Sequence, residues 1–317
     1  MAITAAMVKE LRESTGAGMM ECKKALTETN GDMDAAVEYL RKNGIMKAEK
    51  KASRIAAEGL TRIAVKDDQT AAVVEVNSET DFVAQNEKFQ AFVEAVAQQA
   101  VNSDSKDMDS FMAEKWNLDE SKTVNDALVE ITAVISEKLS IRRFEKVVAS
   151  NGIVVPYIHG NGRISVIVEA TTDVVNDEIK EAVKNIAMQV AALNPKFVSS
   201  DEMSEDYKNH EKEILLAQAM KENEELPEGK RKPQEIIEKM LVGRLNKEFK
   251  EICLNDQVYV KAEDGKQSVA QYLAQVGKAN QANLSIKRFV RFETGEGIEK
   301  KNENFAEEVA KQAGTLK

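Results

Sequence analysis

The sequence predicts an α+β protein: an N-terminal three-helix bundle, a core of two repeated antiparallel sheet-and-helix subdomains, and a protruding antiparallel helical hairpin. Three observations predict it. Residues 4–44 have the apolar spacing of three short helices. Residues 59–97 and 152–187 share one pattern of alternating and then helical apolar residues, and residues 204–249 carry apolar pairs at helical spacing.

Length and composition limit the function classes. The chain has 317 residues, enough for two or three units with separate cores. Its 54 acidic side chains exceed the 44 Lys and Arg, and a net charge of −10 argues against binding a nucleic-acid backbone as the main task. Cys22 and Cys253 lie far apart and fit no disulfide or metal framework, which suits a reducing compartment.

The N-terminus MAITAAMVKELRE lacks the apolar stretch of a signal peptide, and nowhere do 18 apolar residues follow one another. We therefore expect a cytoplasmic protein that binds neither a membrane nor nucleic acid directly and that uses no cofactor.

Three short helices are predicted within residues 4–44. Thr4 can cap the first helix and Asp32 the third, because each can accept a hydrogen bond from a free N–H group of the first turn. Gly44 is expected to stop the third helix, and a separate basic helix over residues 47–59 would then lead to the core. A bundle of this size is marginal alone, which favours a docking module over a catalytic domain.

The centre of the chain contains an internal repeat. Residues 59–83 align with residues 152–175, so that Asp81 falls on Asp173. The helix that follows has the same apolar rhythm in both copies, with Phe89, Val93, Val96 and Ala97 matching Ile179, Val183, Ile186 and Ala187. Each copy is therefore predicted to be a β-hairpin followed by a helix, with helices over one sheet face and polar residues on the other.

The segments after and between these copies predict mainly helices. Residues 123–139 have the apolar spacing of an amphipathic helix. The helical hairpin over residues 204–249 reverses at LPEGKRKP (226–233), which holds two of the four prolines. Strands around one helix are expected over residues 253–297, and a terminal helix over residues 305–313. The expected domain boundaries are 1–55 for the N-terminal domain and linker, 56–150 for the first subdomain, 151–203 and 250–288 for the second, 204–249 for the hairpin, and 289–317 for a C-terminal module.

Catalytic motifs are scarce. His159 and His210 do not form a metal triad, and no nucleophile elbow or Walker sequence is present. The segment Gly160-Asn161-Gly162-Arg163 lies between two strands, so it is expected to form a hairpin turn rather than a phosphate cradle. These observations argue against an enzyme.

Asp81 and Asp173 could be taken for the paired carboxylates of a hydrolase. Because they are equivalent positions of the repeat, each is instead expected to cap the helix that follows its strand.

The stretch SETDFVAQN (78–86) places an aromatic residue in a polar turn between a strand and a helix. The equivalent of Phe82 in the second copy is Val174, so the scaffold itself does not demand an aromatic side chain there. Phe82 either packs over its own sheet or is offered to a partner. Burial in a partner would contribute about 1.5–3 kcal/mol.

Four segments resemble the signature sequences of the bacterial translation elongation factor Ts family. They are VKELRESTGAGMMECKKAL (8–26), EVNSETDFVAQNEKF (75–89), YIHGNGRISVIVE (157–169) and FVRFETGEGIEKKNENFAEEVA (289–310). The resemblance implies the architecture given above and a non-catalytic guanine-nucleotide exchange factor, whose partner is elongation factor Tu in its GDP-bound and nucleotide-free forms. It also allows for contact between two copies of the factor in a higher-order complex.

The family's Thr-Asp-Phe motif matches Thr80, Asp81 and Phe82, followed here by Val83. The resemblance implies that this turn enters between helices of Tu near the nucleotide and displaces Mg²⁺. The resemblance also implies partner contacts at Lys23, Ile135 and His159. Met19 and Met20 are adjacent and cannot both face one small core, so one of them is expected to contact the partner.

Two departures from the family are visible. Ser136 stands where the family has a glycine beside Ile135, and the hairpin turn at 222–234 is longer than usual. One alternative function stays open. The N-terminal bundle is similar in outline to ubiquitin-associated (UBA-like) domains, so the chain could be an adaptor that binds peptides or proteins.

Overall fold

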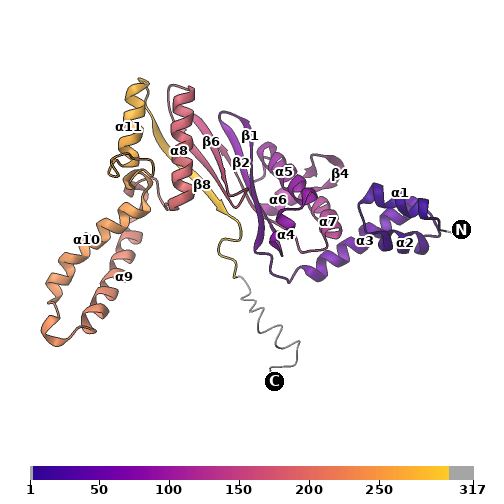
Figure 1. Ribbon diagram of the computed structural model, residues 1–317, viewed down its shortest axis with the longest axis horizontal. Coiled ribbons are helices and arrows are strands. Elements are labelled where there is room, and N and C mark those ends of the chain that lie inside the picture. The colour runs from indigo at the N-terminus through magenta and orange to yellow at the C-terminus, as the bar shows by residue number, and fades with distance from the viewer. Residues whose placement is uncertain (1–2, 300–317) are drawn as a thin grey trace.

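The computed structural model describes residues 3–299, without the side chains of residues 47–49. The predicted α+β architecture is confirmed. In Figure 1 the N-terminal helices form one end of the molecule, the sheets and the helices that cover them form the middle, and long helices project from the other end. No helix among the described residues has the length and apolar character needed to cross a lipid bilayer.

The N-terminal domain comprises α1 (Ala5–Thr15), α2 (Met19–Glu28) and α3 (Met33–Lys51). Thr4 caps α1 by accepting a hydrogen bond from the Met7 backbone N–H, and Asp32 accepts one from the N–H of Ala35, as predicted. The small core is made by Val8, Leu11, Cys22, Ala25, Leu26 and Ala36.

The end of α3 differs from the prediction. The helix continues through Gly44 to Lys51, so Gly44 is not a stop and no separate helix covers residues 47–59. A Cβ atom added to Gly44 would lie 3.4 Å from Cβ of Ala133, so the glycine permits a close crossing with a helix of the core. Gly44 therefore serves the close packing of α3 against the core helix and does not end α3.

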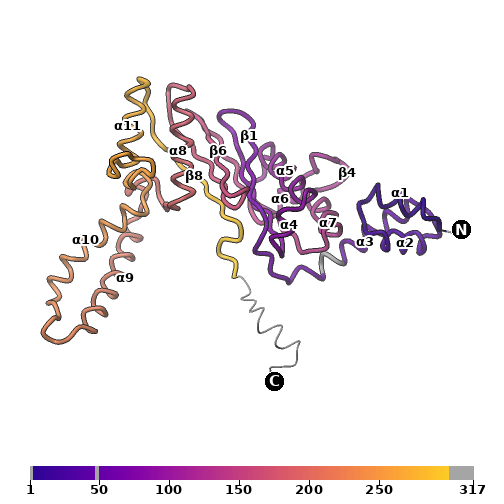
Figure 2. The backbone as a smooth tube through the Cα atoms, in the orientation of Figure 1, coloured from indigo at the N-terminus to yellow at the C-terminus, as the bar shows by residue number. Residues whose placement is uncertain are grey.

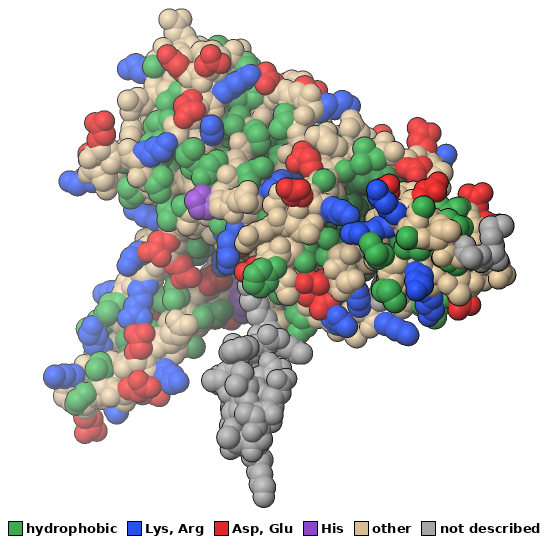
Figure 3. Space-filling view, turned by 45° about the vertical axis from the view of Figure 1, so that its right-hand side comes forward, with side chains coloured by type: hydrophobic (Ala, Val, Ile, Leu, Met, Phe, Trp, Pro, Cys, Tyr) green, Lys and Arg blue, Asp and Glu red, His purple; other side chains and the backbone are tan. Residues whose placement is uncertain are grey.

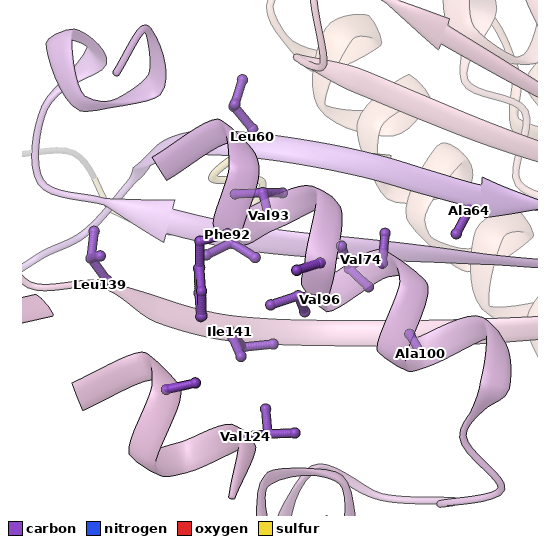
Figure 4. Close-up of a cluster of buried hydrophobic side chains, with 14 of the residues drawn as sticks. Leu60, Ala64, Val74, Phe92, Val93, Val96, Ala100, Val124, Leu139 and Ile141 are labelled. Atoms are coloured by element: carbon purple, nitrogen blue, oxygen red, sulfur yellow. The ribbon is translucent and has the colours of Figure 1, made fainter. Parts of the chain in front are cut away.

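The first subdomain is a three-stranded antiparallel sheet in the order β1-β2-β5, covered by helices on one face. Figure 4 shows side chains of α5 and α7 directed at this sheet, among them Val93, Val96 and Val124. Its elements are β1 (Glu58–Asp67), β2 (Thr70–Ser78), α4 (Asp81–Ala84), α5 (Glu87–Asn102), α6 (Met108–Ala113), β3 (Lys115–Trp116), β4 (Asp119–Thr123), α7 (Val124–Ile135) and β5 (Ser140–Val148).

The second subdomain repeats this plan with the order β6-β7-β8. Gly59 and Gly152, equivalent in the repeat, have φ of +125° and +126°. A Cβ at either would lie 2.2 or 2.0 Å from a backbone oxygen of the neighbouring strand. The elements are β6 (Ile153–His159), β7 (Ile164–Thr171), α8 (Asp177–Leu193), α11 (Val269–Ala279) and β8 (Ser285–Glu293).

The two sheets pack face to face. All nine residues of β2 are buried, so the expectation of one polar sheet face is wrong. An apolar layer fills the space between the sheets, and Thr61 joins them directly: its N–H donates to the Gly162 carbonyl at 2.7 Å and its hydroxyl to Ser165 at 2.8 Å. The layer contains Ile63, Ala71, Val73, Val147, Ala149, Val154, Ile167, Val290 and Phe292.

The projecting hairpin consists of α9 (Glu205–Glu224) and α10 (Gln234–Ile252), which run antiparallel away from the second subdomain (Figure 2). The tip between the two helices is ordered by the side chain of Asn223, which bonds both the N–H and the C=O of Lys232. α10 ends three residues later than predicted.

Residues 253–260 do not form the predicted strand. They contain a short 3₁₀ helix (Leu254–Asp256) and two isolated bridges. The side-chain amide of Gln189 bonds the Val258 carbonyl and the Val260 N–H, taking the place of a partner strand. The predicted helix over 305–313 lies outside the described residues.

A buried carboxylate fastens the segment after β8 to the first subdomain. Both oxygens of the fully buried Glu75 are bonded, to Arg142 at 3.0 Å, to Arg143 at 2.6 Å, to the Gly295 N–H at 2.8 Å and to Asn77 at 3.0 Å. Burial alone would raise the pKa of Glu75, but these donors outweigh it and the pKa lies below its ordinary value.

We expect Glu75→Gln to lower the free energy of unfolding at pH 7 by about 3 kcal/mol, because it removes the charge that two arginines and a backbone N–H solvate. Since the folded pKa is depressed, this contribution is complete above the unfolded pKa and is lost as pH falls through the folded pKa. Urea unfolding at pH 7 and at pH values below the ordinary glutamate pKa of 4.5 checks this. Glu94→Gln, an exposed control on α5, should change little; equal effects of both variants would contradict the assignment.

Gly59→Ala should cost about 3 kcal/mol of stability, because the new methyl meets the Val76 carbonyl at a left-handed backbone position. Gly243→Ala is the matched control: it lies exposed in the interior of α10 with open space around it, and should stabilise by about 1 kcal/mol. Chemical denaturation should therefore give a lower free energy of unfolding for Gly59→Ala and a higher one for Gly243→Ala. An unchanged free energy of unfolding for Gly59→Ala would contradict the steric argument.

Candidate partner-binding surface

Phe82 lies on α4, a single helical turn between β2 and α5 at the edge of the first subdomain (Figure 1). Its side chain is 80% exposed, the highest value among the large hydrophobic side chains that the structure describes, whereas its neighbour Val83 is 8% exposed and packs in the core. The alternative that Phe82 covers its own sheet is therefore excluded by the structure.

The local sequence explains this orientation. The α4 turn is closed by hydrogen bonds from Gln85 N–H to the Phe82 carbonyl and from Asn86 N–H to the Val83 carbonyl. Asn86 then starts α5, since its side chain accepts from the N–H groups of Lys88 and Phe89. With Val83 fixed inward, its predecessor on so short a helix is turned toward solvent.

The predicted capping roles of Asp81 and Asp173 are wrong. Asn86 caps α5 and Asn176 caps α8, because these asparagines directly precede the first helical residue. The Asp81 carboxylate is exposed and makes no hydrogen bond or ion pair with the part of the chain that the structure describes.

Asp173 instead accepts two hydrogen bonds of 2.8 Å from Asn283, and the backbone bond lowers the pKa of its carboxyl. Asp81 lies on α4 after β2, whereas Asp173 lies in the loop after β7, a strand of the other sheet, and they share no hydrogen-bond partner among the described residues.

The N-terminal domain presents a second exposed region on α2. Met19 and Met20 are 55% and 76% exposed and Lys23 is exposed, while Cys22 on the same helix points into the core. Only one of the two methionines was expected outside; α2 begins at Met19, and its buried face starts only at Cys22. Figure 3 shows basic and hydrophobic side chains together over this end of the molecule.

Ile135 and His159 occupy two further positions. Ile135 ends α7, half-buried against the first core. His159 is exposed at the end of β6, with Nδ1 3.0 Å from the Tyr157 hydroxyl. The segment 160–163 forms the predicted turn between β6 and β7.

The structure thus gathers Thr80 to Val83 in one turn and places Ile135 at the end of α7, two residues before Glu137, which contacts Thr80. The remaining positions lie on other elements, which describes a broad surface and not a pocket. No three His, Cys, Asp or Glu side chains among those described are grouped to hold a metal ion. Both cysteines are buried, and burial raises the pKa of Cys253 to about 11, which leaves that thiol protonated.

Three residues that the sequence analysis did not select also meet at the turn. Glu137 accepts hydrogen bonds from Thr80, and Glu79 accepts one from the backbone N–H of Lys138. Glu79 stands inside the quoted stretch and Glu137 beside Ile135, but nothing in the sequence pairs positions so far apart.

The known proteins that this chain resembles are protein factors of translation elongation. The family model described as Elongation factor TS matches residues 79–296. The chain is 52% identical over 311 residues to elongation factor Ts of Clostridioides difficile (strain 630), with 98% of each chain covered. It is 49% identical to that of Clostridium perfringens (strain 13) and 48% identical to that of Clostridium tetani, over 98% of this chain and 99% of each relative. The chain therefore belongs to the elongation factor Ts family.

Asn86→Ala should lower the free energy of unfolding by about 1 kcal/mol, because two N–H groups of α5 lose their acceptor. Asp81→Ala, five residues earlier, should stay within about 0.5 kcal/mol of the parent. Chemical denaturation of the two variants checks the reassigned cap, which would be wrong if Asp81→Ala were the more destabilised protein.

Proposed function

We propose that this chain speeds the loss of GDP from elongation factor Tu by inserting Phe82, with Asp81 beside it, between helices of Tu close to the nucleotide and its Mg²⁺. Membership of the elongation factor Ts family supports the general role of a guanine-nucleotide exchange factor in protein synthesis. The observation that carries the finer proposal is the 80% exposure of Phe82 on a turn in which the next residue, Val83, is buried.

The mechanism is thermodynamic linkage. Factor and nucleotide each bind Tu, and each weakens the other by the same factor. A nucleotide is held in such GTPases largely by backbone amides around its phosphates and by a bridging Mg²⁺. A displacement of the surrounding helices therefore speeds GDP release although no covalent bond changes. When GTP enters, the same reciprocity expels the exchange factor.

The magnitudes show that Phe82 cannot act alone. Burying one phenylalanine contributes about 1.5–3 kcal/mol. Because about 1.4 kcal/mol corresponds to a factor of ten in rate, the ring supplies one or two tenfold steps. We assign the rest to a wide contact that includes Lys23, Met19, Met20, Ile135 and His159, all at least partly exposed.

An ordered turn adds to the effect of the ring. Side chains and loops that must be immobilised on binding reduce the free energy available for displacing the partner's helices. The α4 turn is hydrogen-bonded at both ends in the free chain, at Thr80 and at Asn86. Its binding energy is therefore available for work on the partner.

An adaptor function is the second candidate, and the exposed methionines of α2 are the observation that favours it. Methionine is common at surfaces that bind varied apolar partners. An adaptor of this kind would bind through the N-terminal domain alone.

Phe82→Ala should slow the maximal release of fluorescent GDP from Tu by about ten- to a hundredfold, because the variant lacks the ring that the proposed complex buries in Tu. Leu118→Ala is the matched control, since it truncates a 74% exposed side chain in the turn between β3 and β4 and should leave release unchanged. Stopped-flow measurement at saturating factor decides; normal release with Phe82→Ala removes the wedge from the mechanism.

Met19→Glu combined with Met20→Glu separates the two functions. An exchange factor should keep its maximal release rate and bind nucleotide-free Tu about tenfold more weakly for about 1.4 kcal/mol of lost contact. An adaptor would lose every interaction. Titration of Tu with the double variant distinguishes these outcomes, and complete loss of binding would favour the adaptor.

A further inference from the structure

The turn that carries Phe82 exchanges hydrogen bonds with the loop after α7. Both carboxylate oxygens of Glu137 accept from Thr80, one from the backbone N–H at 3.0 Å and the other from the hydroxyl at 2.7 Å. In return, Glu79 accepts a hydrogen bond from the backbone N–H of Lys138. Glu137 thus bonds Thr80, the residue after Glu79, and Glu79 bonds Lys138, the residue after Glu137. The two contacts join positions that are 57 and 59 residues apart in the chain.

The backbone geometry directs Glu137 toward the turn. α7 ends at Ile135, and Ser136 adopts the left-handed conformation with φ of +65°. Its N–H donates to the Thr132 carbonyl, which is the usual way in which a left-handed residue terminates a helix. The chain therefore turns back immediately after the helix and leads Glu137 to Thr80.

The same loop also holds the segment that follows α3. The ammonium group of Lys138 donates to the carbonyls of Ala52 and Arg54, both at 2.7 Å. The guanidinium of Arg54 in turn contacts Glu79 at 3.2 Å. Three separate parts of the chain are joined at this point, close to the exposed aromatic ring.

The anchoring leaves only two side chains of the turn free. Thr80 is fixed by Glu137, and Val83 is buried in the first core. Asp81 and Phe82, between these anchors, are both exposed. A helix of four residues has too few internal hydrogen bonds to hold this orientation by itself.

We propose that Glu137 is a positioning residue for nucleotide exchange: by holding Thr80 through both carboxylate oxygens, it orders the turn that presents Phe82 before the partner arrives. The inference rests on the proposed function of Phe82. Without Glu137 the turn samples other conformations, and only the fraction in the competent one can insert.

The test compares Glu137→Ala with Glu137→Gln and with the matched control Glu130→Ala. Glu130 lies on α7, seven residues before Glu137, and like Glu137 it bonds another side chain, that of Lys122. It does not contact the turn. We expect Glu137→Ala to slow maximal GDP release about tenfold, for a competent fraction reduced to about one tenth. Glu137→Gln keeps one acceptor oxygen and should be intermediate, and Glu130→Ala should match the parent.

Two further measurements separate positioning from a general loss of stability. The Thr80 amide of the free protein should exchange with deuterium faster in Glu137→Ala and not in Glu130→Ala, because its acceptor is lost. Combining Glu137→Ala with Phe82→Ala should give the rate of Phe82→Ala alone, since the two residues act through one insertion.

Thr80→Val provides a second variant that removes the hydroxyl donor and keeps the shape of the side chain. It should slow release in the parent and add nothing to Glu137→Ala. Slow release with Phe82→Ala and normal release with Glu137→Ala would overturn the positioning role and leave the wedge intact. Normal release with Phe82→Ala would overturn the wedge, and with it the role of Glu137. Multiplicative rates in the double variant would also overturn the positioning role, because Glu137 would then act independently of the ring.

Discussion

The packing of one three-stranded sheet against the other is the constraint on which the rest of the molecule depends. The layer between them is apolar and continuous, and Thr61 sets the alignment through its bonds to Gly162 and Ser165. Helices cover the outer faces, so β2 is enclosed on both sides. Such interiors resist gradual deformation. The candidate contact residues, such as Phe82 on α4 and His159 at the end of β6, lie at the edges and turns of this stiff body.

The proposed wedge mechanism needs a stiff body. In that mechanism the aromatic side chain can displace a partner's helices only if its own support deforms less than they do. The support here is Val83, buried in the core directly after Phe82 in the chain, and the hydrogen-bonded Thr80 two residues before Phe82. The exposed ring is unfavourable in isolation, and it becomes useful because the surrounding residues prevent its collapse onto the sheet.

Much of the fold could be predicted from periodic patterns. The repeat was visible because both copies need the same buried positions and the same glycine where one strand approaches another, at Gly59 and Gly152. Local rules failed where distant segments decide. Gly44 has the sequence character of a helix end but serves a helix crossing, and residues 253–260 pair with the side chain of Gln189 instead of a strand.

The candidate site shows the same division. Phe82 could be selected from the sequence because its repeat equivalent is Val174, which isolates the aromatic as an unexplained feature. The capping roles given to Asp81 and Asp173 were wrong, because Asn86 and Asn176 stand closer to the helix starts. Glu137 could not be selected from the sequence, because its proposed role depends on a contact with Thr80, which is 57 residues away in the chain.

The crossing of α3 over α7 has a consequence for recognition. α7 touches the N-terminal helices at Gly44 and, through Lys138 just beyond its end, also grips the segment leaving them. The methionines of α2 and the ring of Phe82 thus belong to one framework and not to modules on a slack tether. In the proposed complex one encounter would therefore bring both regions onto the partner, and the loss of rotational and translational freedom would be incurred only once.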